Sequence, residues 1–200
     1  MDTVLENGVG NSNYKARVDA KGRLYGLSIA QGQTAAASLE EQSCFMWETG
    51  VITLIGSTLT SVLWLRNDDP SRFLLINKFT VCWNGGNANR NRGINGIVFA
   101  NTGEPNANHV LFPAGNMFLG ASKQAVTTSY RWDTVGVGGM THVTAGVMGV
   151  RQVYPPGVWQ FEFGGAMILD YKVAISVSGM AEEDGKAAVQ IAGWYQDKES

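Results

Sequence analysis

The stretch that decides the fold is residues 158–196, VWQFEFGGAMILDYKVAISVSGMAEEDGKAAVQIAGWYQ. Apolar and polar residues alternate in it with a period of two, the pattern of strands that bury one face. The pattern predicts a strand at 159–163, one long strand at 167–178 and, after the charged turn at 182–185, a last strand ending at Tyr195. One face of the long strand is expected to hold Leu169, Tyr171, Val173, Ile175 and Val177.

The same period of two occurs in residues 45–83. Short apolar runs at 51–55 and 62–65 predict two strands, the second buried on both faces. A third strand is expected at 73–83, where alternation places a set of apolar residues on one face: Phe73, Leu75, Phe79, Val81 and Trp83. This part of the chain is therefore also expected to be sheet.

The middle of the chain gives weaker patterns. Short strands are expected at 97–100 and 110–112, and residues 113–149 are expected to be loops with one or two edge strands. Only residues 33–43, QTAAASLEEQS, have the propensity of a helix. About eight strands separated by glycine-rich turns indicate a sandwich or barrel, and connections of uneven length favour a Greek-key jelly roll.

The sequence thus predicts an all-β protein, a jelly-roll (Greek-key) β-sandwich with an extended N-terminal arm. The arm is expected at residues 1–30, and a single sandwich domain at residues 31–200. Two hundred residues suffice for one domain that holds its core without a disulfide or metal.

Composition narrows the function classes. Charged residues are 16% of the chain against about 25% in an average protein, which suits neutral faces covered by copies of the chain or by a partner. The net charge of −2 argues against a nucleic-acid partner. No apolar run approaches the roughly 20 residues of a membrane span, so no membrane is expected either. The acidic start, MDTVLE, lacks the pattern of a secretory signal.

The N-terminal arm is the first candidate site. Residues 15–25 carry four positive charges and one negative charge, with apolar or aromatic residues between them. Such a segment is expected to become ordered against an acidic partner, although a floppy terminus is the alternative. The candidate docking residues are Tyr14, Lys15, Arg17, Val18, Lys21, Arg23, Leu24 and Tyr25.

No pattern in the sequence predicts catalysis, a metal or a cofactor. His109 and His142 have no partner at metal-ligand spacing, and the cysteines Cys44 and Cys82 have no base beside them. Two free thiols are expected, with a bridge left open. Residues 67–69, NDD, predict an Asx-type turn rather than a calcium site, because calcium wants six to eight oxygen ligands.

The loop at residues 84–95 is the second candidate site. It is almost pure Asn, Gly and Arg, and its Asn89, Arg90 and Arg92 present donors that suit a glycan. A solvated loop tip is the alternative. Trp64 and Trp83 are expected in the core, whereas Trp159 and Trp194 suit the core, a subunit interface or a sugar platform equally.

Four short stretches resemble virion proteins of tailed bacteriophages: YKARVDAKGRL at 14–24, TGVITL at 49–54, PPG at 155–157 and GWY at 193–195. The resemblance implies a jelly-roll capsid decoration (cement) protein, head fibre or spike. It also implies a homotrimer in the virion whose N-terminal arm docks on the major capsid protein or another virion protein.

Two other classes remain as alternatives. A carbohydrate-binding jelly-roll module, attached to a host surface glycan, is supported by the Asn/Arg loop and the six tryptophans. A cupin-like enzyme ranks third, because cupins surround a metal with several histidines and a glutamate. The sequence favours a structural or binding protein over an enzyme.

Overall fold

A computed structural model describes residues 3–6, 15–18, 24–25, 42–85, 94–134, 139–142, 145–150 and 157–198. Every regular element in these ranges is a β-strand, which confirms the all-β prediction. The chain divides into two compact units, Met1–Gly32 and Gln33–Ser200. The helix expected at 33–43 lies outside the described residues except for Gln42 and Ser43, which are not helical.

The first unit contains a three-stranded antiparallel sheet. Its strands are β1 (Thr3–Glu6), β2 (Lys15–Val18) and β3 (Leu24–Tyr25), in that order across the sheet. Only ten residues form these strands, and a sheet this small needs a packed hydrophobic face for independent stability. The segment expected as an extended arm thus pairs with itself in the part that the structure describes.

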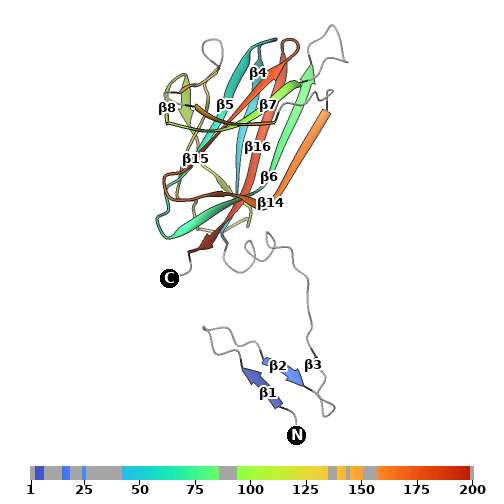
Figure 1. The fold of residues 1–200 in the computed structure, drawn as a ribbon, viewed down its shortest axis with the longest axis vertical. Coiled ribbons are helices and arrows are strands. Elements are labelled where there is room, and N and C mark those ends of the chain that lie inside the picture. Colours follow the sequence, from blue (N-terminus) through green and yellow to red (C-terminus); the bar gives the residue numbers. More distant parts are fainter. Residues whose placement is uncertain are drawn as a thin grey trace. The chain divides into compact units, whose positions relative to one another are not determined.

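The second unit contains two antiparallel sheets around one core, an arrangement consistent with a β-sandwich (Figure 1). We call this unit the sandwich. The five-stranded sheet has the order β10 (Gly115–Asn116), β4 (Cys44–Leu54), β16 (Gly185–Asp197), β6 (Arg72–Gly85), β14 (Gly157–Leu169). The six-stranded sheet has the order β13 (Ala145–Val150), β7 (Ile94–Thr102), β15 (Ala174–Ala181), β5 (Leu59–Asn67), β11 (Thr127–Trp132), β9 (His109–Leu111). Two short strands, β8 (Pro105–Ala107) and β12 (Thr141–His142), pair separately.

The long strands pair in a nested order. The first of them, β4, pairs with the last, β16, and β5 pairs with β15, the next to last. Further inward, β6 pairs with β14 and β7 with β13. Each of these four pairs therefore joins a strand from the first part of the sandwich's sequence to a strand from its last part.

The core lies between the two sheets. Trp47, Trp64 and Tyr195 are the largest side chains that are almost fully buried. Residues 60–65 of β5 are all buried, which confirms the prediction of a strand buried on both faces. Trp64 and Trp83 are buried as expected, and Cys44 and Cys82 are free thiols.

The face predicted for residues 73–83 is wrong on one side of Asn77. The core takes Leu74 and Ile76 before this residue and Phe79, Val81 and Trp83 after it: the first two come from the face expected to be opposite. The pairing of β6 with β16 shifts register between Ala192 and Gly193, so Asn77 is an extra residue in β6. Such a bulge reverses which face later residues occupy. Leu75 instead joins Cys44 and Trp194 in a second cluster.

The single strand predicted at 167–178 is also wrong. The chain turns at residues 170–173, where the Val173 amide donates to the Asp170 carbonyl over 3.0 Å and Lys172 has a φ of 62°. Tyr171 is 46% exposed instead of lying on a buried face.

In the middle of the chain β11 is flanked by β5 and β9, so this strand is interior and not an edge.

Aromatic side chains from strands of the six-stranded sheet pack together on its outer face. Leu63 pairs with Val177, which faces the other sheet, so Trp64 lies on the outer face, yet it is only 1% exposed. Tyr130 packs on the Trp64 ring with centroids 5.6 Å apart, and His109 packs edge-on against Tyr130 at 4.4 Å. Arg66 also lies over the Trp64 ring, 5.3 Å from its centroid, so side chains of the sheet itself help to bury Trp64.

Candidate interaction surfaces

The predicted docking residues fall only partly on described strands. Lys15, Arg17 and Val18 lie in β2, and Leu24 and Tyr25 form β3. The other predicted residues lie outside the described part of the chain: Tyr14, Lys21 and Arg23 of the arm, and Asn89, Arg90 and Arg92 of the loop.

The register of the N-terminal sheet brings the predicted docking positions together. Arg17 of β2 is opposite Tyr25 of β3, and Val18 is opposite Leu24. On its other side Arg17 is opposite Val4. Neighbours in register share a face of the sheet, and adjacent positions alternate between faces. The cationic and the apolar positions of β2 therefore belong to opposite faces.

Residues 110–126 form an apolar surface that the sequence patterns did not predict, and we call it the apolar segment. Among the described residues ten large apolar side chains are exposed, and five of them belong to this segment: Val110, Leu111, Met117, Leu119 and Val126. Leu119 is 92% exposed. The signal in the sequence was the lack of charge, since Lys123 is the one charged residue in the segment. Exposed apolar residues gathered in this way are typical of a contact with another protein.

Hydrogen bonds hold the apolar segment in place. The Asn116 side chain donates from Nδ2 to the carbonyls of Gln42, over 2.9 Å, and Lys123, over 3.0 Å. Its Oδ1 accepts from the Phe118 amide at 2.8 Å. The Cys44 thiol donates to Met117 Sδ at 3.3 Å. The segment is therefore a formed surface that closes one flank of the sandwich between β9 and β10.

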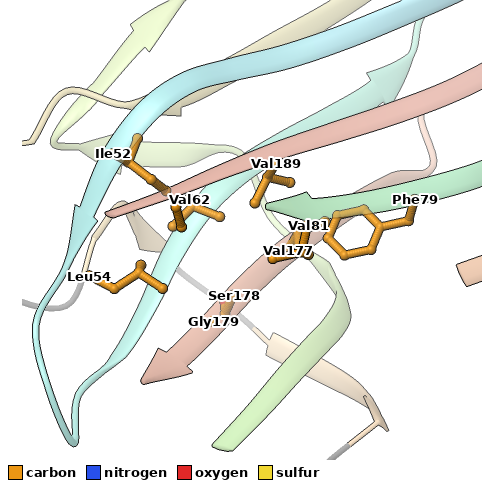
Figure 2. A pocket seen from close by; sticks show the side chains of 10 residues that line it. Ile52, Leu54, Val62, Phe79, Val81, Val177, Ser178, Gly179 and Val189 are labelled. Atoms are coloured by element: carbon orange, nitrogen blue, oxygen red, sulfur yellow. The ribbon is translucent and has the colours of Figure 1, made fainter. Parts of the chain in front are cut away.

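The apolar segment also forms a groove with a volume of about 540 Å³. Its lining is mostly apolar: Leu111, Phe112, Pro113, Ala114, Gln124, Ala125 and Thr127. This volume is large enough to accept side chains of a partner. In contrast, the cavity between the two sheets, lined by Ile52, Val62 and Val189 among others, measures about 10 Å³ (Figure 2). That is the volume of about one water probe, too small for a ligand.

An ionic cluster lies on the outer face of the six-stranded sheet. Arg66 donates to Asp68 Oδ1 at 2.8 Å and to Glu104 Oε2 at 2.6 Å. Lys172 donates to Asp68 Oδ1 at 2.7 Å, and the Tyr130 hydroxyl donates to Glu104 Oε1 at 2.8 Å. The cluster joins β5, β11, the turn between β14 and β15, and the chain after β7. Its charges are paired with one another, so the cluster is a structural clasp.

The clasp shifts the pKa values of its carboxyl groups. Partial burial would raise the pKa of Asp68, but hydrogen bonds from Lys172, Thr128 and Arg66 outweigh it and lower the pKa to about 2. The hydrogen bond from Tyr130 lowers the pKa of Glu104. Carboxyl groups with lowered pKa values stabilise the fold above their usual pKa and lose this contribution as the pH falls.

We expect acid to weaken the sandwich through Asp68. Its usual pKa is 3.8, so its contribution is complete above about pH 5 and is lost as the pH falls toward 2. The loss amounts to about 2 kcal/mol. Urea unfolding at several pH values measures the free energy of unfolding. Between pH 5 and pH 2 this free energy should fall less in Asp68→Asn than in the natural protein, by about 2 kcal/mol. The exposed Asp197→Asn is the control and should keep the full fall; equal slopes in all three proteins would contradict the prediction.

The described residues hold no group of three or more His, Cys, Asp or Glu side chains placed to bind a metal ion. Burial raises the pKa of the Cys44 thiol to about 11, which keeps this cysteine protonated and poorly nucleophilic. The Asx-turn hypothesis for residues 67–69 is confirmed, because Asn67 Oδ1 accepts from the Asp69 amide at 3.0 Å. The described part of the chain contains no helix that is long and apolar enough to cross a membrane.

No protein-family model matches the chain, and no curated protein matches it.

Proposed function

We propose that this chain is a structural virion protein of a tailed phage, a homotrimeric capsid decoration or head-fibre protein attached through its N-terminal unit. The observation that carries the proposal is the division of the chain into two units of different kind. The sandwich has a complete core of its own, whereas the N-terminal sheet has ten strand residues. A unit that small gains stability by packing on a partner.

The nested strand order supports the assignment of the sandwich as a jelly roll. Folding one long hairpin into two sheets produces two Greek keys, which define that architecture. The pairs β4–β16, β5–β15, β6–β14 and β7–β13 follow this path. Jelly rolls occur in viral capsid proteins, in lectins and in cupins, so the assignment is compatible with the virion resemblance and also with a carbohydrate-binding module.

The N-terminal unit is the proposed attachment site. Lys15 and Arg17 lie in β2, and their charges would steer the unit to an acidic surface of the major capsid protein or another virion protein. Val18 and Leu24 are paired in register, and an apolar pair of this kind would hold the contact once it formed. In this proposal the N-terminal unit attaches the protein to the particle, and the sandwich mediates self-association.

Self-association is supported by the apolar segment and is tested by native mass spectrometry of the full chain. A monomer mass of 21.5 kDa would contradict a trimer and favour a carbohydrate-binding module. The expected result is a mass three times that of one chain, which persists on dilution to the nanomolar range. A glycan array run on the same sample separates the two functions, because the carbohydrate-binding module depends on glycan binding and the virion protein does not.

A further inference from the structure

The outer face of the five-stranded sheet carries an apolar row across four strands. Val51 of β4 is opposite Ala188 of β16, which is opposite Cys82 of β6, which in turn is opposite Val158 of β14. We call these four residues the outer row. Val51 is 73% exposed and Val158 is 63% exposed, although both are β-branched residues that suit buried sheet positions.

The residues beside the outer row are mostly neutral. On one side Glu48 is opposite Gln190, which is opposite Thr80, which in turn is opposite Gln160. On the other side Thr53 accepts a hydrogen bond from Lys186 Nζ at 2.6 Å. The outer face of the six-stranded sheet differs, because it carries the ionic clasp and the buried Trp64. The described part of the chain leaves the outer row uncovered.

The size of this face fits a stable protein contact. From strand spacing and rise, four strands the length of β4, which has 11 residues, present about 700 Å². A standard interface buries about 800 Å² on each partner. The adjoining edge strand β14 is 13 residues long and has no strand beyond it among the described residues. A long open edge of this kind is usually covered in natural proteins.

We infer that the outer row packs against the apolar segment of a second copy of this chain. A closed ring of identical subunits needs two different surfaces that face each other across every contact. The sandwich presents two, the outer row on its five-stranded sheet and the apolar segment on the flank between β9 and β10. The two surfaces lie on adjoining sides of the sandwich. Each contact therefore rotates one subunit relative to the next, which allows a ring to close.

The two surfaces also complement each other in shape and polarity. The groove of the apolar segment, about 540 Å³, accepts projecting side chains, and Val51 and Val158 project from the outer row. The outer face carries Glu48 and Lys186 beside the outer row, and Lys78 is opposite Glu162 one row further, so its charges balance. The apolar segment carries the single charge of Lys123. The inference rests on the self-association part of the proposed function and does not require attachment to a virion.

The natural cysteines supply a direct test in the full chain. Cys82 lies in the outer row and is partly exposed in a single copy, whereas Cys44 is fully buried. In the assembled protein, alkylation of Cys82 by iodoacetamide, followed by mass spectrometry, should be at least about tenfold slower than in a monomeric variant. Cys44 is the internal control and should stay unmodified wherever the sandwich is folded.

Two substitutions should produce that monomer, one on each surface. Val158→Lys and Leu119→Lys each place a charge in the contact and should give a monomer mass with rapidly alkylated Cys82. Leu59→Lys changes a residue that is 46% exposed and belongs to neither surface, so it should keep the assembled mass. An assembled protein with reactive Cys82, or one that survives Val158→Lys, would overturn the inference while leaving self-association intact. A monomeric natural protein would instead overturn the proposed self-association.

Discussion

Replacing Asn67 with alanine is expected to destabilise the sandwich by about 3–5 kcal/mol. Asn67 is fully buried, and its Nδ2 donates to the carbonyls of Arg72, at 2.9 Å, and Leu169, at 3.0 Å. Its Oδ1 accepts from the Asp69 amide. The substitution leaves these three backbone groups without the partner, and each such group costs about 1–3 kcal/mol when buried.

The effect is large because Asn67 joins the two sheets. It ends β5 of the six-stranded sheet, whereas Arg72 begins β6 and Leu169 ends β14 of the five-stranded sheet. Its backbone also bonds to Lys172 and Val173 in the turn before β15. Urea unfolding of the full chain measures the loss. Asn106→Ala, at an exposed position, is the matched control and should change stability by less than about 0.5 kcal/mol; a loss that small for Asn67→Ala would contradict the role assigned to it.

The strands were predictable where one face is apolar and the other is polar. Residues 159–163 alternate in this way: Trp159, Phe161 and Phe163 of β14 pack against the core, and Gln160 and Glu162 are exposed. The alternation misled at residues 73–77, because both faces of β6 are apolar there: Leu74 joins the main core and Leu75 the second cluster. When either face can be buried, the sequence does not show where a bulge shifts the phase.

The turn after β14 shows a second limit. Residues 170–172, DYK, contain neither glycine nor proline, and their apolar neighbours continue the alternation into β15. Asp170 closes the turn by accepting from the amides of Tyr171 and Val173. Distant contacts also hold it, because the Asn67 carbonyl accepts from the Lys172 amide and the Asn67 amide donates to the Val173 carbonyl. The nested pairing of the strands could not be predicted, because paired strands such as β4 and β16 lie far apart in the sequence.

The candidate surfaces were predictable to different degrees. The charge pattern of residues 15–25 pointed to the N-terminal unit, but the pairing of Arg17 with Tyr25 depends on a register that charge does not encode. The apolar segment could have been found from its lack of charge. The outer row could not, because Val51, Ala188, Cys82 and Val158 become neighbours only through strand pairing.

Removing residues 2–32 is expected to abolish attachment to particles without unfolding the sandwich. The deletion takes away the whole first unit and leaves β4 to β16 and their core unchanged. The truncated protein should therefore unfold at about the same urea concentration as the full chain. A milder variant, Lys15→Ala with Arg17→Ala, should reduce attachment and make the remainder less sensitive to salt, because salt screens the charges that steer the encounter and the variant lacks two of them. Lys198→Ala removes a positive charge from the sandwich and is the control.

The most direct test of the proposed function is the amount of this protein on purified phage particles assembled in cells that supply each variant. We expect full occupancy for the natural chain and for Lys198→Ala, and none for the chain that lacks residues 2–32. Occupancy of the truncated chain equal to that of the natural chain, or absence of the natural chain from the particles, would contradict it.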